Sequence, residues 1–213
     1  MAARGFTLIE LLISITIIGV VLVIVMGALR IGINAWEKGE ADIEAYQRQQ
    51  IILELVKQQL ASIQPSAIQK EEDETPYYFL GSRRTVEFVS AVSIVPGNRY
   101  GKVFVKYRIR GAGGGNKVSL EIYETGLLTA AGEESPFDPG DGAYHFLLED
   151  MEGIRFAFLL QKDDAPAEWV SSWDPEVVEA KLPRAVRISL QAEKKAPEVS
   201  AVGRIAVDVP EKK

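Results

Sequence analysis

The sequence predicts an α+β protein in which one long N-terminal helix packs on a head of antiparallel β-sheet. Three observations support this fold class. Residues 11–29 form an apolar run without a charged side chain, no proline occurs between Met1 and Gln64, and short alternating segments separated by turns follow Pro65. With 213 residues, 47% of them hydrophobic, the chain can build a true core, which excludes wholesale disorder.

Composition excludes several function classes. The chain has 24 Lys and Arg against 30 Asp and Glu, a net charge of −6, so nucleic acid is not an expected partner. Cysteine is absent, which removes disulfides, thiolate nucleophiles and zinc–thiolate sites. His145 is the single histidine, so a site with several histidine ligands is excluded too. We therefore expect no metal and no cofactor.

The apolar run of residues 11–29 could be a secretory signal, a membrane anchor or a buried core helix. As a helix it spans about 28 Å, close to the hydrocarbon thickness of a bilayer, which is long for a core helix. The sequence Ala28-Leu29-Arg30 after the run makes a poor signal-peptidase site. A membrane anchor is favoured, and Arg4 before the run orients the N-terminus toward the cytoplasm.

Glu10 does not fit a plain anchor, because it lies inside the apolar block of the first helix. A carboxylate in the middle of a bilayer costs about 2.5–3.5 kcal/mol on insertion scales, and less near the interface. The side chain either reaches the lipid headgroups or awaits a partner of opposite charge.

Residues 4–12, RGFTLIELL, resemble the class III signal sequence of type IV pilins and type II secretion pseudopilins. The resemblance implies that a prepilin peptidase removes the basic leader 1–5 by cutting between Gly5 and Phe6, and then methylates Phe6. It also implies that Glu10 pairs with the mature N-terminal amine of a neighbouring subunit during filament assembly. Two charges that are costly in a low-dielectric setting would then offset each other.

The helix is expected to continue from Phe6 to about Ile63, apolar over residues 6–29 and amphipathic over a stem of residues 30–64. The β-rich head then covers residues 65–213. Apolar side chains at helical spacing on the stem are candidates for stem-to-stem or stem-to-sheet contacts, and the pattern leaves open which they serve: Ile43, Tyr46, Leu53 and Val56.

Beyond Pro65 we expect a charged loop at residues 70–75 that is not a calcium loop, followed by about six or seven antiparallel strands. Alternation places strands at residues 85–90, 103–109, 118–122, 154–160, 186–190 and 205–209. The glycine-rich residues 111–116 would join the second and third of these strands as a hairpin. Residues 138–142 form a double turn whose two aspartates could also hold a cation.

The segment from Trp169 to Pro175, with residues 181–190 after it and 149–158 before it, resembles the J-type minor pseudopilins of type II secretion systems. Asp174 departs from the family pattern, because it separates Trp173 from a proline that often follows directly. The two tryptophans, Trp169 and Trp173, are spaced for core packing, although an exposed tryptophan could instead contact a partner.

This resemblance implies a structural role without catalysis. The protein would join I- and K-type minor pseudopilins in a tip complex that primes assembly of the major pseudopilin for export of folded proteins. It would sit in the bacterial inner membrane as a single-pass protein with its head in the periplasm. The alternative is a minor pilin of a type IV pilus or competence system. A membrane-anchored periplasmic enzyme is more distant, since the sequence has no G-x-S-x-G elbow.

Overall fold

The computed structural model describes residues 7–64, 68–70, 73–75, 79–97, 101–111, 116–127, 139–161, 166–174 and 182–205. These contain one long helix, α1, eleven strands and a short 3-10 helix, η1 (Asp141–Ala143). The chain divides into two compact units, Met1–Arg48 and Gln49–Lys213. Helix and antiparallel sheets confirm the predicted α+β, pilin-like fold class.

Helix α1 runs from Leu8 to Ala61 without interruption, as the absence of proline predicts. Two hydroxyl groups in its apolar part donate to helix carbonyls one turn earlier in the chain. Ser14 Oγ donates to the Glu10 carbonyl at 2.7 Å, and Thr16 Oγ1 donates to the Leu12 carbonyl at 2.8 Å. The helix ends slightly earlier than expected. Ile63 lies beyond it and forms an isolated antiparallel bridge with Ser90, because sheet pairing replaces the last helical turn.

The first large sheet is a five-stranded antiparallel meander in the order β3-β4-β5-β6-β7. The strands predicted at 85–90, 103–109 and 118–122 are confirmed, as is the hairpin that pairs Gly111 with Val118. The outer strands were not predicted, because β3 is short and β7 pairs irregularly. The five are β3 (Phe79–Gly81), β4 (Thr85–Ser90), β5 (Val103–Gly111), β6 (Val118–Gly126) and β7 (His145–Met151).

The second large sheet has four antiparallel strands in the order β11-β10-β8-β9. The strands predicted at 154–160 and 186–190 are confirmed. The last strand that the structure describes is Val199–Arg204, which was not predicted. Ile205, the first residue of the strand predicted at 205–209, follows it, and residues 206–209 lie outside the described residues. The four are β8 (Gly153–Leu160), β9 (Glu168–Val170), β10 (Ala185–Gln191) and β11 (Val199–Arg204).

A third, two-stranded sheet replaces most of the predicted charged loop at 70–75. Its strands are β1 (Ile68–Lys70) and β2 (Asp73–Thr75), which pair antiparallel with Lys70 opposite Asp73. The prediction of six or seven strands was therefore too low. Strands of three mostly charged or polar residues show no alternation of apolar side chains, so the sequence does not indicate them. Only their backbone pairing defines them.

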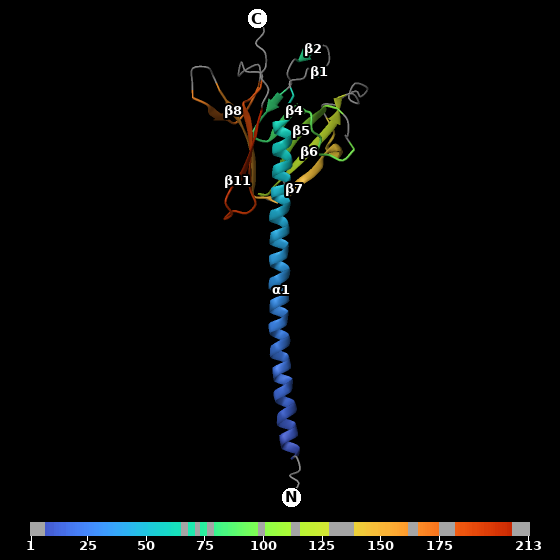
Figure 1. Ribbon diagram of the computed structural model, residues 1–213, viewed down its shortest axis with the longest axis vertical. Helices are drawn as coiled ribbons and strands as arrows, with labels where there is room; N and C mark the ends of the chain where they lie inside the picture. Colours follow the sequence, from blue (N-terminus) through green and yellow to red (C-terminus); the bar gives the residue numbers. More distant parts are fainter. Residues whose placement is uncertain are drawn as a thin grey trace. The chain divides into compact units, whose positions relative to one another are not determined.

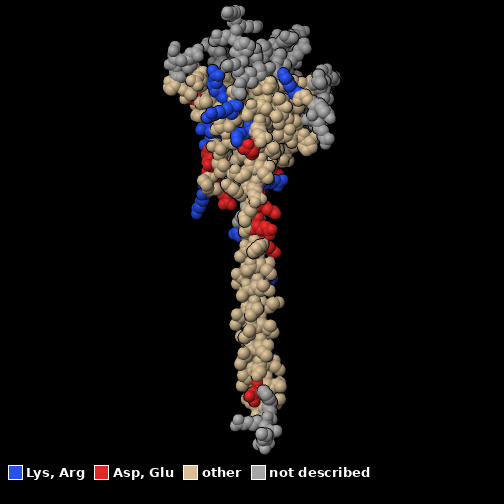
Figure 2. All heavy atoms as spheres, viewed as in Figure 1, with Lys and Arg blue, Asp and Glu red and all other residues tan. Residues whose placement is uncertain are grey.

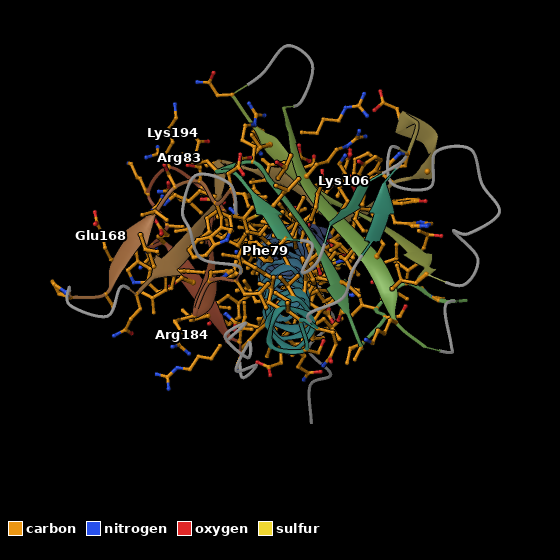
Figure 3. All side chains as sticks on the ribbon, turned by 90° about the horizontal axis from the view of Figure 1, so that it is seen from above. Phe79, Arg83, Lys106, Glu168, Arg184 and Lys194 are labelled. Atoms are coloured by element: carbon orange, nitrogen blue, oxygen red, sulfur yellow. The ribbon has the colours of Figure 1, made fainter. Side chains whose placement is uncertain are left out.

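The two large sheets and the last turns of α1 share one hydrophobic core in the Gln49–Lys213 unit (Figure 1). Phe79 lies toward the middle of this unit in the view along the helix (Figure 3). Its ring packs edge-on to two others, with 5.8 Å between ring centroids for Phe158 of the second sheet and 6.4 Å for Trp173. Gly81 in the edge strand β3 and Trp173 exchange two backbone hydrogen bonds of 2.8 Å, which join the first sheet to the segment that follows β9.

Candidate assembly helix and head surfaces

The apolar front of α1 presents its side chains outward on every side. No residue in the most apolar stretch of the helix is buried, and the helix is long and apolar enough to cross a membrane. Figure 2 shows this stretch as a length of helix nearly free of Lys, Arg, Asp and Glu side chains. A helix that is apolar all round needs lipid or other helices to cover it, so this part is suited to anchoring and to helix packing.

Glu10 lies in the first turn of α1, where the helix dipole favours a negative charge. Its side chain has no ion-pair partner among the described residues. The predicted cleavage and methylation positions, Gly5 and Phe6, lie outside the described residues. The structure therefore places a carboxylate that no described residue pairs with in an exposed apolar surface.

The four predicted stem positions divide into two pairs. Ile43 and Tyr46 are 60% and 59% exposed, whereas Leu53 and Val56 are 4% and 0% exposed and belong to the head core. Trp36 is 76% exposed and was not singled out from the sequence. A tryptophan seven residues beyond an apolar run is itself a signal, because tryptophan is enriched at membrane interfaces.

The two predicted tryptophans have different surroundings. Trp173 is 1% exposed within the core, and its Nε1 has no hydrogen-bond partner among the described residues. Trp169 is half-buried on β9, and the Arg187 guanidinium lies 4.3 Å from its ring centroid. The structure therefore makes Trp173 a packing residue and leaves Trp169 partly exposed.

A buried polar network ties the end of α1 to the first sheet. Gln59 is fully buried, and its Nε2 donates to Glu124 Oε1 at 2.6 Å while its Oε1 accepts from the Tyr107 hydroxyl. Glu124 also accepts from the backbone N–H groups of Ile94 and Val95. Burial, with a smaller contribution from Glu124, raises the pKa of Tyr107 well above its ordinary value. No local pattern predicts this network, because its members are far apart in sequence.

The predicted turn near residue 140 forms η1, and its acidic side chain has a basic partner. Asp141 Oδ1 accepts from Arg108 Nη1 at 2.6 Å, which lowers the pKa of the Asp141 carboxyl. Arg108 also pairs with Glu121 and lies over the Tyr144 ring. Within the described parts of the chain no group of His, Asp and Glu residues could hold a metal ion, and Asp138 lies outside them. His145 is exposed at the start of β7.

A groove of about 310 Å³ lies between the last turns of α1 and β11. Its lining combines apolar side chains with polar ones: Gln50, Leu53, Glu54 and Lys57 from α1, and residues 199–202 from β11. Lys57 and Glu54 pair with each other at 2.9 Å. The groove therefore has a mixed lining, in which apolar side chains lie beside polar ones and an internally paired Glu54 and Lys57.

Two family models match the chain. The model described as Type II secretion system (T2SS), protein J, matches residues 27–200, and the model described as Prokaryotic N-terminal methylation motif matches residues 1–26. No individual curated protein sequence matches the chain. The first match covers most of the chain, including the last turns of α1, the first large sheet and all of the second except the last residues of β11. The second covers Glu10 and nearly all of the exposed apolar helix.

Proposed function

Because the chain belongs to the protein J family of the type II secretion system, we propose that it acts in the tip complex of the pseudopilus. The family consists of minor pseudopilins, which are structural proteins and not enzymes. In this complex the chain joins I- and K-type minor pseudopilins and primes assembly of the major pseudopilin. The observation that carries the proposal is the family match over residues 27–200, which spans the β-rich head.

Processing by a prepilin peptidase is part of this proposal. The enzyme cuts between Gly5 and Phe6 and methylates Phe6, which leaves a mature chain that begins with the apolar helix. The match to the N-terminal methylation motif supports this step. The apolar helix together with this motif indicates anchoring in the inner membrane. We propose a single-pass topology with the N-terminus in the cytoplasm and the head in the periplasm.

Glu10 is proposed to pair with the methylated N-terminal amine of a neighbouring subunit. Its position supports this role, because an uncompensated carboxylate in an apolar surface is costly until an opposite charge arrives. Ile43 and Tyr46 are proposed as stem contacts between subunits, since both are exposed apolar side chains. Trp169 is proposed as a contact with a partner, because tryptophan and arginine are enriched in the energetic centres of interfaces.

The test is co-purification of the full-length chain from membranes. The tagged chain is co-expressed with the I-, K- and major-type pseudopilins of the same genome and extracted in detergent, and the mass of the complex is measured. A complex that contains the I- and K-type proteins is expected. Binding only to minor pilins of a type IV pilus or competence system would instead support that alternative.

Two further measurements test the site residues. The intact mass of the extracted protein should correspond to loss of residues 1–5 and addition of one methyl group. Glu10→Gln should reduce recovery of partners about tenfold or more, because loss of a buried ion-pair partner costs several kcal/mol. Glu37→Gln, on the same helix, is the matched control and should leave recovery unchanged. Equal recovery with both variants would contradict the role of Glu10.

A further inference from the structure

Among the strands that the structure describes, β11 lies at an edge of its sheet. In the four-stranded sheet it pairs with β10 alone, and no other described strand pairs with it. The Ile205 N–H donates to the Arg184 carbonyl at 3.0 Å, which fixes the alternation of the ladder. Counting back, the backbone groups of Ala201 face β10, whereas those of Ser200 and Val202 face the open edge.

The other edges of the two large sheets carry features that discourage pairing, and β11 does not. Strand β7 has register shifts, two acidic residues and a left-handed residue, Asp150, with φ of 58°. Strands β3 and β9 have only three residues each, and β3 is bridged to Trp173. Strand β11 pairs in continuous register over six residues, without an acid or a proline. Natural sheets protect such edges or use them for binding.

The groove beside β11 can receive side chains. Val199 and Ala201 of β11 and Leu53 of α1 contribute its apolar lining, over a volume of about 310 Å³. An added strand places alternate side chains toward each face of the sheet, so every second side chain of an incoming segment would enter this groove.

Charge indicates the chemistry of the incoming segment. Arg204, at the end of β11, is exposed, and no acidic side chain among the described residues pairs with it. Glu54 and Lys57 in the groove already neutralise each other. An acidic residue that comes to lie opposite Arg204 would therefore be favoured, since opposite charges on neighbouring strands stabilise pairing.

We propose that the open edge of β11 accepts an extended segment of a neighbouring pseudopilin as a fifth strand of this sheet. The segment supplies an apolar side chain to the groove and an acidic side chain opposite Arg204. Main-chain hydrogen bonds then give affinity, and the groove and Arg204 give selectivity. This inference rests on the proposed function, because it requires that the chain assembles with other pseudopilins.

The test compares two substitutions at one position in the full-length chain. Val202→Pro removes an N–H that faces the open edge, so the ladder to β10 keeps its hydrogen bonds. Val202→Ala removes the same side chain but keeps the N–H. For the pseudopilin that binds the wild-type chain, Val202→Pro should weaken affinity about tenfold or more. Val202→Ala should stay within about threefold of wild type.

Hydrogen exchange in the wild-type complex gives an independent measurement that needs no variant. Binding should slow exchange of the Ser200 and Val202 amides, while the Ala201 amide, already bonded to β10, should change little. Unchanged exchange at Ser200 and Val202 in a formed complex would overturn the inference, and so would equal affinity of the proline and alanine variants with unaltered melting temperatures.

The outcomes separate this inference from the proposed function. A wild-type chain that binds no pseudopilin contradicts the proposed function, and the inference falls with it. A wild-type chain that binds while its β11 edge stays unprotected contradicts the inference alone. Self-association of the chain that Val202→Pro abolishes would assign the edge to a second copy and would also contradict the proposal.

Discussion

The front and the last turns of α1 have the same backbone and opposite surroundings. Leu22 in the front part is 58% exposed, and Leu60 near the end is fully buried in the head core. The side chains of the front are exposed in the described structure, whereas the last turns contribute Leu53, Val56 and Leu60 to the core. One helix thus provides an apolar surface that the described residues leave exposed and a second surface whose burial completes the head.

Leu60→Ala should give the largest contrast between these two regions. It opens a cavity in a packed core, so the free energy of unfolding of the head should fall by about 2–5 kcal/mol. Leu22→Ala is the matched control, and it should leave head stability unchanged. Chemical denaturation of the full-length chain in detergent measures both, with the near-ultraviolet circular dichroism as the signal. Equal effects of the two substitutions would contradict the comparison.

Glu124→Ala should have the second largest effect, because it removes the acceptor that holds the end of α1 to the first sheet. Gln59 Nε2 loses one of its two acceptors and keeps the Val92 carbonyl. The backbone N–H groups of Ile94 and Val95 lose their side-chain acceptor. We expect a loss of about 2–4 kcal/mol in unfolding free energy, since buried donors left unpaired are costly. Glu149→Ala, at an exposed position of β7, serves as the control and should change stability little. A similar melting temperature for both variants would contradict the role of the network.

Gly203→Ala tests how closely β11 approaches the last turns of α1. A Cβ at this position would lie 2.6 Å from Leu60 Cβ and 3.1 Å from the Lys57 carbonyl oxygen, so backbone must shift. A destabilisation of about 1–3 kcal/mol is expected. Gly153→Ala is the control, because the nearest atom to its added Cβ is 4.0 Å away. Thermal unfolding of the two variants should separate them, and coincident curves would refute the close contact.

The smallest expected effect is that of acid on Glu198, which belongs to the head and not to the helix. A hydrogen bond from Ser189, and then the Arg155 guanidinium, lowers the pKa of the Glu198 carboxyl below its ordinary value of 4.5. A carboxyl whose pKa is lowered by folding stabilises the folded state at pH values above its unfolded-state pKa. This stabilisation is lost as the pH falls through the pKa of the folded state. Glu198→Gln should therefore narrow the stability difference between pH 7 and pH 3 slightly. An unchanged or wider difference would contradict this sign.

The sequence predicts the helix and the regular strands well because periodicity carries them. The absence of charged side chains defines residues 11–29, and apolar residues at every second position define β5 and β10. The sequence did not predict β7, since its pairing with β6 contains register shifts. It did not predict β11 either, since Val199–Arg204 contains glycine and serine where a strand is usually richer in bulky side chains.

The candidate site was predictable in part. The apolar helix and the residues around Glu10 follow from a local motif. The division of the stem face between Tyr46 and Leu53 does not, because both are apolar at helical spacing and only the position of the sheets buries one of them. Gln59 and Glu124 are 65 residues apart, so their contact depends on tertiary structure alone.

The three tryptophans occupy three distinct environments, and this gives the molecule its own optical reporters. Trp36 is 76% exposed on the helix, Trp169 is half-buried beside Arg187, and Trp173 is 1% exposed in the core. Indole emission shifts to the blue as water is excluded, so variants that keep one tryptophan each would report separate events. Trp36 would report insertion into lipid, Trp169 the arrival of a partner, and Trp173 the loss of the folded head.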